Sequence, residues 1–158
     1  MIGPEDIEAF QYYSADEQGD PRDRSPLDMV REYHKTAKLD LDVDINSTFP
    51  VMVEDLLAFR LKLIDAEHDE LAQEIWKRGM IDRDWVDPEK ILKELADLVY
   101  VCYGLAATFG FDLDEAFRRV HENNMGRMYQ PDGTIKRRAD GKILKNKDYP
   151  PVDLGDLT

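Results

Sequence analysis

Cysteine, net positive charge and long apolar segments are scarce or absent in this sequence. The only cysteine is Cys102, so an intrachain disulfide cannot form and a zinc site built on cysteines is excluded. The 21 basic residues are outnumbered by 34 acidic ones, and the formal net charge of −13 disfavours DNA and RNA, whose phosphates require clustered basic side chains. We therefore expect a protein of a reducing cytoplasm with no nucleic-acid polymer as a partner.

No apolar stretch reaches the roughly 20 residues that span a bilayer. The longest, LVYVCYGLAATFG at 98–110, is shorter and predicts a buried helix. The first residues, MIGPEDIEAF, are acidic where a secretory signal would carry positive charge, so neither export nor a membrane partner is expected.

The 158 residues suffice for one domain with a hydrophobic core, and the chain divides into three parts. Residues 1–24 have no sustained period and predict an N-terminal arm. Residues 25–128 carry helical patterns. Residues 129–158 form a tail with turn signals at PDG and ADG, which indicates an irregular segment or a short hairpin, and its basic residues stand out in an acidic protein: Lys136, Arg137, Arg138, Lys142, Lys145 and Lys147.

Four helices are expected between residues 25 and 128. Ser25 and Pro26 begin the first, which runs to about Lys38. From Pro50 to a stop at Gly79, apolar residues recur at helical spacing: Val53, Leu57, Leu61, Ile64, Leu71 and Ile75.

Two further helices follow the long one. Asp87 and Pro88 begin the third helix, and Gly110 ends it. Asp112 caps the fourth, with Glu115 in a capping-box position, and this helix closes near 125–126. The prediction is an all-α domain of the four-helix-bundle type.

Two pairs of acidic residues stand in the apolar stripes of the second and third helices. Glu67 and Glu70 are three residues apart, as are Glu94 and Asp97, so each pair shares a helix face. At a rise of about 1.5 Å per residue the pairs lie at matching depths, roughly 14–18 Å and 10–15 Å from the connecting turn. If the two helices are antiparallel neighbours, the four carboxylates face one another.

Clustered carboxylates in a partly dry seam need a counter-charge. Oxygen ligands favour hard cations, so the pattern indicates Mg²⁺ or Mn²⁺, and a pair of ions could bridge phosphate oxygens and activate water. The alternative is that these pairs belong to solvated helix faces, where acidic residues three apart are common in so acidic a chain.

The pattern EHDE at 67–70 followed by ELAD at 94–97 resembles the signature of the all-alpha nucleoside triphosphate pyrophosphatases, the MazG-like superfamily. The similarity extends from about Phe49 to Leu154 and includes the phosphoribosyl-ATP pyrophosphatase branch. It implies metal ligation by Glu67, Glu70, Glu94 and Asp97, and attack of water on the α-phosphorus with release of pyrophosphate.

The resemblance also implies further roles and partners. Contacts to phosphates or ribose are implied for Asn124, Arg127, Arg138, Asp140, Lys142 and Lys145. It implies a homodimer or a dimer of dimers as well. Relatives specific for dUTP often carry a second glutamate where this chain has Ala66, so the general base stays open between Glu67, Asp65 and water on the metal. dGTP, GTP and dUTP are the leading substrates.

Three other functions remain as alternatives. A phosphoribosyl-ATP pyrophosphatase-like activity would use the same carboxylates. A di-iron or di-manganese redox bundle would also bury carboxylates, but it usually has Glu-x-x-His pairs, which this sequence does not contain. A non-catalytic helical module that dimerises through its apolar faces would bind no nucleotide.

Overall fold

The computed structural model describes residues 23–46, 49–80 and 87–158, with the side chains of 77–80 left outside that description. Most of the predicted N-terminal arm, 1–24, lies outside these ranges. Within them the regular structure is helical: α2 (Pro26–Ala37), α3 (Pro50–Met80), α4 (Pro88–Phe109), α5 (Leu113–Met128) and a 3₁₀ turn, η2 (Gly155–Leu157). The all-α prediction is confirmed.

The helix boundaries follow from capping residues. The Ser25 hydroxyl accepts the Asp28 N–H at 3.1 Å, and Lys38 closes α2 in the left-handed region at φ 56°. The Asp87 carboxylate accepts the N–H groups of Glu89 and Lys90 at the start of α4, which ends at Gly110 with φ 71°. These starts and stops match the predicted ones.

One predicted stop is wrong by a residue. Helix α3 continues through Gly79 to Met80, so Gly79 lies inside the last turn rather than ending the helix. A single glycine inside a helix costs less than about 1 kcal/mol relative to alanine, which the flanking turns can absorb.

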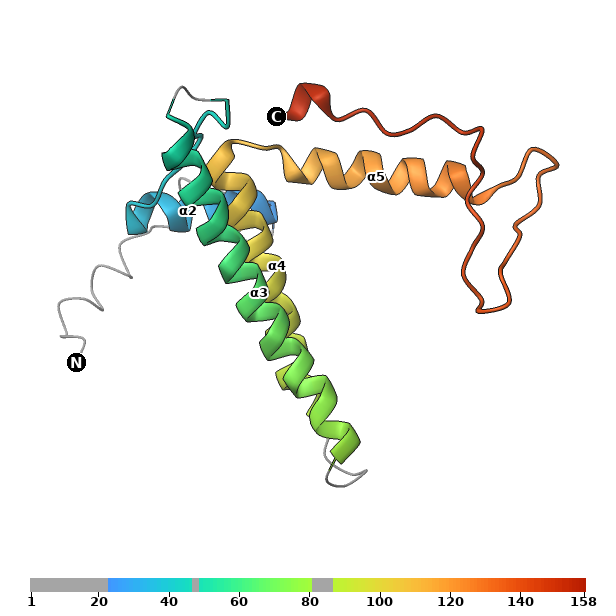
Figure 1. Cartoon of the computed structure of the whole chain (residues 1–158), viewed down its shortest axis with the longest axis horizontal. Helices are drawn as coiled ribbons and strands as arrows, with labels where there is room; N and C mark the ends of the chain where they lie inside the picture. The colour runs from blue at the N-terminus through green and yellow to red at the C-terminus, as the bar shows by residue number, and fades with distance from the viewer. Residues whose placement is uncertain (1–22, 47–48, 81–86) are drawn as a thin grey trace.

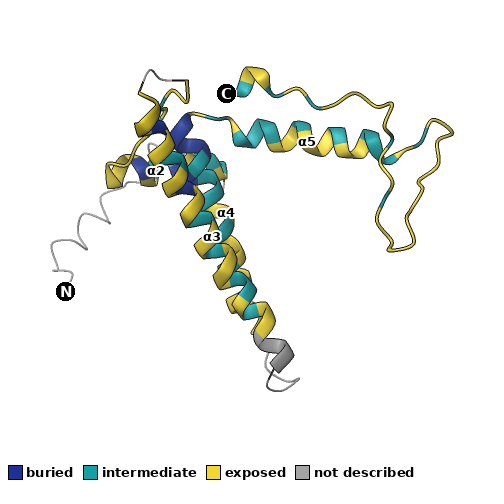
Figure 2. Ribbon diagram, viewed as in Figure 1, coloured by how far each residue is buried: buried dark blue, intermediate teal, exposed yellow. Residues whose placement is uncertain are grey.

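Helices α3 and α4 run side by side as a long hairpin, and α2 packs across one end of it (Figure 1). The buried residues gather at that end, as the dark blue segments in Figure 2 show. The apolar ones are Val30, Val53, Ala106, Ala107 and Phe109. The far end of the hairpin has little buried surface, so its outer faces remain exposed in a single chain.

Three polar side chains are buried in the same core: His34, Arg60 and Thr108. The Thr108 hydroxyl donates to the Gly104 carbonyl at 2.9 Å, and His34 Nδ1 lies 3.0 Å from the Asp40 carbonyl. Burial lowers the pKa of His34, which favours the neutral ring. His34 is thus a packing residue of the core.

Helix α5 leaves the hairpin instead of packing along it. A bend of 115° separates α4 from α5, and Figure 1 shows α5 extending away from the α3–α4 hairpin. Asp112 caps α5 by accepting the Glu115 N–H at 3.0 Å. In a complete capping box the Glu115 side chain would accept the Asp112 N–H. Here the Asp112 N–H donates to the Leu157 carbonyl instead. The helix also ends at Met128, beyond the predicted 125–126.

The tail 129–158 turns back along α5. Gly133 and Gly141, the glycines of PDG and ADG, have φ of 76° and 83°, the left-handed region that glycine adopts readily. A single antiparallel bridge joins Arg137 and Ile143, so of the two forms that the sequence left open, an irregular segment or a short hairpin, the tail combines a short hairpin with otherwise irregular backbone.

None of the described helices alone has the length and hydropathy needed to cross a membrane. Helices α4 and α5 meet that test only as a pair joined across the 115° bend.

Candidate functional site

Carboxylates from α3 and α4 meet in the seam of the hairpin. One oxygen each from Glu67, Glu70 and Glu94 lies within 4.8 Å of the other two. Glu67 is half-buried and the side chain of Glu94 is 12% exposed, whereas Glu70 is open to solvent. Helix geometry predicted that the two acidic pairs lie at matching depths, and the structure brings Glu67, Glu70 and Glu94 together.

Asp97 joins this group through a lysine. Lys93 Nζ lies 2.8 Å from Asp97 Oδ2 and 3.1 Å from Glu94 Oε2, so one ammonium bridges the two carboxylates of α4. Both contacts raise the pKa of Lys93, which keeps it charged. Sequence reasoning missed Lys93, although its position four residues before Asp97 places these two side chains on one helix face.

The electrostatics of the seam favour a bound cation. Partial burial raises the pKa of Glu67, and the negative charges of Glu70, Asp97 and Glu94 raise it further, while Lys93 opposes the shift. Glu67 thus lies in negative potential that a single ammonium does not neutralise.

The donor set fits a hard divalent cation. Adjacent oxygens of an octahedral Mg²⁺ site lie roughly 3 Å apart and opposite ones roughly 4 Å apart, so oxygens that are 4.8 Å apart or closer reach ligating positions by approaching one another by at most about 1.8 Å. Cys and His ligands, which favour zinc and copper, are not among these residues. Asp65, the other candidate base, is exposed and outside the cluster.

The predicted phosphate-binding residues form two groups on α5 and the tail. At the base of the tail, Lys145 Nζ donates to Asn124 Oδ1 at 2.9 Å, and the Arg127 carbonyl accepts the Asn146 N–H at 2.7 Å. The Nε of Arg127 is buried and has no hydrogen-bond partner among the described residues. Arg127 and Lys145, two of the predicted phosphate-binding residues, thus lie where the tail packs against the end of α5.

The second group occupies the hairpin tip. Arg138 pairs with Asp140, whose carboxylate also accepts the Lys142 N–H at 3.1 Å. All three side chains are exposed. They surround the left-handed turn at Gly141 and present two cationic groups to solvent.

The basic part of the tail lies apart from the carboxylate seam within one chain. Figure 1 shows the tail hairpin at the far end of α5, away from the α3–α4 hairpin, whereas the last residues of the tail return to the start of α5, where Leu157 accepts the Asp112 N–H.

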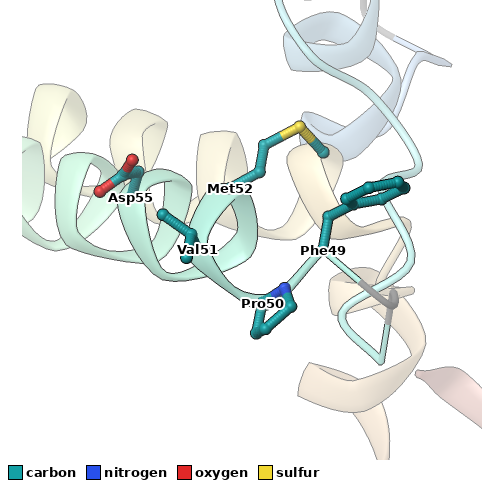
Figure 3. A pocket seen from close by; sticks show the side chains of 5 residues that line it. All are labelled: Phe49, Pro50, Val51, Met52 and Asp55. Atoms are coloured by element: carbon teal, nitrogen blue, oxygen red, sulfur yellow. The ribbon is translucent and has the colours of Figure 1, made fainter.

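An apolar hollow of about 420 Å³ lies at the other end of α3 from the carboxylates. Figure 3 shows its lining of Phe49, Pro50, Val51, Met52 and Asp55. Asp55 is its only charged side chain, and Glu67 is twelve residues, about 18 Å, further along α3. The hollow is therefore separate from the carboxylate seam.

An aromatic side chain near the seam is open to solvent. Aromatic residues at helical spacing usually pack inside a core, but Trp76 on α3 is 75% exposed. The core closes near α2, so the distal part of the hairpin has no third helix to cover Trp76.

Comparison with known proteins gives one match. The family model described as phosphoribosyl-ATP pyrophosphohydrolase matches residues 30–124, which include both carboxylate pairs. A search of curated proteins found no match.

Proposed function

Because this chain belongs to the phosphoribosyl-ATP pyrophosphohydrolase family, within the all-alpha nucleoside triphosphate pyrophosphatase superfamily, we propose that it hydrolyses a nucleoside triphosphate to the monophosphate and pyrophosphate. The observation that carries the proposal is the convergence of three carboxylate oxygens within 4.8 Å between α3 and α4. A purely structural helix seam would place apolar residues there.

Glu67, Glu70, Glu94 and Asp97 would hold the divalent cation or cations, with Mg²⁺ or Mn²⁺ suited to oxygen ligands. When bound, such ions lower the pKa of a coordinated water and stabilise charge on the departing pyrophosphate. The chain's own part is to fix these carboxylates on two rigid helices, with the Lys93 ammonium balancing the charge of Asp97 and Glu94 until a divalent cation takes its place.

The basic groups of α5 and the tail would grip the phosphates and the sugar. A guanidinium offers paired donors to phosphate oxygens and an ammonium offers a point charge. Arg127, Arg138, Lys142 and Lys145 supply these groups, and Asn124 offers an amide.

A second copy of the chain would bring the tail and the seam together. An exposed apolar stripe on α4 supports this: Leu92, Leu95 and Val99 are 66%, 45% and 46% exposed and follow one another at three- and four-residue spacing. Such stripes in single chains mark interfaces. We therefore propose a homodimer, or a dimer of dimers.

The proposed substrates belong to the deoxynucleotide pool, with dGTP, GTP and dUTP first and phosphoribosyl-ATP as the alternative named by the family description. The test incubates the purified chain and Mg²⁺ or Mn²⁺ with each common triphosphate and with phosphoribosyl-ATP, and measures pyrophosphate and monophosphate. Equal release of the two products supports the proposal. Release of inorganic phosphate together with the nucleoside diphosphate, or no product from any substrate, contradicts it.

A further inference from the structure

The aromatic ring of Tyr149 lies directly on the backbone of α5 at Gly126. A Cβ atom added to Gly126 would lie 2.3 Å from both Cζ and Oη of Tyr149 and 2.6 Å from its Cε2. Side chains essentially never approach so closely, so this contact requires glycine. Gly126 lies in the last turn of α5, at a helical position where glycine is less favourable than alanine, and the ring supplies a reason for it there.

The Gly126–Tyr149 contact sits among hydrogen bonds that fasten the tail to α5. On one side, Asn123 Nδ2 donates to the Pro150 carbonyl at 2.9 Å. On the other, the Asn146 N–H donates to the carbonyl of Arg127 at 2.7 Å. The tail segment 145–150 therefore lies against little more than one turn of α5. A side chain at position 126 would push the Tyr149 ring away from the helix and disturb these hydrogen bonds.

The same segment carries one of the proposed phosphate-binding residues and leads directly from the hairpin. Lys145 precedes Asn146 and donates to Asn124 at 2.9 Å, while the hairpin that holds Arg138 and Lys142 joins the helix through 144–146. Displacement of 145–150 from α5 moves Lys145 and releases one of the two connections between the hairpin and α5, the other being the chain through Tyr129.

We propose that Gly126 and Tyr149 form a clasp, defined as the contact of the Tyr149 ring with the Gly126 backbone, and that this clasp positions the tail for binding the phosphates of the substrate. Both are positioning residues, since neither needs to touch the substrate. The inference rests on the proposed role of the tail.

The test compares Gly126→Ala, Tyr149→Ala and the double variant with the wild type. We expect each single variant to raise KM by at least about tenfold, the factor that losing one hydrogen bond to a charged group brings, with little change in kcat. In the double variant the added Cβ no longer meets a ring, so its KM should equal that of Tyr149→Ala. Met125→Ala, the adjacent helix position, and Tyr149→Phe, which keeps the ring, are the controls and should behave as wild type.

An unchanged KM in Gly126→Ala overturns the clasp. The clasp is also overturned if Gly126→Ala raises KM by the same factor in the Tyr149→Ala background as in the wild type. A fall in kcat without a rise in KM overturns its positioning role.

A second measurement separates this inference from the proposed function. Tryptic cleavage after Lys142, Lys145 and Lys147, followed by mass spectrometry under native conditions, should be faster in both single variants than in wild type and in Met125→Ala. If the wild type turns over no substrate, the proposed function fails while the cleavage rates still judge the clasp. Unchanged cleavage in both single variants contradicts it.

Discussion

Arg60 places a guanidinium in the core at 5% exposure, with the Phe59 ring 5.6 Å from its centre. Its Nε has no hydrogen-bond partner among the described residues, and burial lowers its pKa. A buried charge with incomplete pairing costs more than an apolar side chain of similar volume.

Arg60→Met should therefore leave the free energy of unfolding unchanged or raise it by about 1 kcal/mol or more, because the desolvation cost disappears. Chemical denaturation monitored by circular dichroism measures this. His34→Met, which removes a ring whose Nδ1 lies 3.0 Å from the Asp40 carbonyl, should destabilise and serves for comparison. A loss of stability in Arg60→Met would show that the guanidinium is fully paired in solution.

Lys93 supplies a positive charge of the chain itself to the carboxylate seam. Its ammonium contacts Asp97 and Glu94 and would compete with a divalent ion for their oxygens. Lys93→Gln should tighten Mn²⁺ binding severalfold, measured by calorimetry, since one opposing charge is removed. Lys90→Gln, which lies one turn away and pairs with Asp87, should bind Mn²⁺ as the wild type does. Weaker binding in Lys93→Gln would instead mean that the lysine holds the carboxylates in their ligating positions.

For individual residues of the candidate site, the sequence was informative where spacing along a helix alone determines where a side chain lies. Glu67, Glu70 and Glu94 could be brought together from helix rise and the place of the turn. The Lys93 bridge and the close approach at Gly126 could not, because each depends on side-chain and tail positions that no periodicity encodes.

The helices themselves were largely predictable, because Ser25, Asp87, Gly110 and Asp112 are capping residues whose chemistry acts locally. The direction of α5 was not. Its 115° bend from α4 and its pairing with the tail depend on long-range contacts, among them Arg119 with Asp156 at 2.6 Å.

The ion pairs of α5 give it a defined acid sensitivity. Hydrogen bonds from Arg118 and Arg119 lower the pKa of Glu115 to about 2, and Arg119 lowers that of Asp156. A depressed carboxyl pKa contributes stability above the ordinary value of 4.5, and this contribution is lost as pH falls toward 2.

Glu115→Gln should therefore lower the thermal midpoint above pH 5, and its difference from the wild type should vanish between about pH 4.5 and 2. Calorimetry across that range measures it. Glu89→Gln, an exposed carboxylate in the first turn of α4, controls for the loss of one negative charge. A difference that stays constant down to pH 2 would contradict the pairing.

Among the residues that the structure describes, exposed large apolar side chains outnumber buried ones, and Leu92, Leu95 and Val99 form an exposed stripe along α4. Burial of this stripe against a second chain removes its apolar surface from water. We expect light scattering to report a dimer or tetramer for wild type and a smaller species for Leu95→Glu. Glu54→Lys, an exposed change on α3, should keep the wild-type mass. A wild-type monomer would contradict the two-chain site.

Whether the seam carboxylates hold a cation that hydrolysis needs is decided by measuring cation binding and pyrophosphate release for Glu94→Gln side by side. We predict that the wild type binds Mn²⁺ and that Glu94→Gln binds it more weakly by at least the roughly 10–100-fold that losing a residue which only supports a ligand brings, with a matching loss of product and an unchanged circular dichroism spectrum. Asp69→Asn, which removes an exposed carboxylate 3.5 Å from His68, should retain both properties. Pyrophosphate release by Glu94→Gln at the wild-type rate would contradict the account.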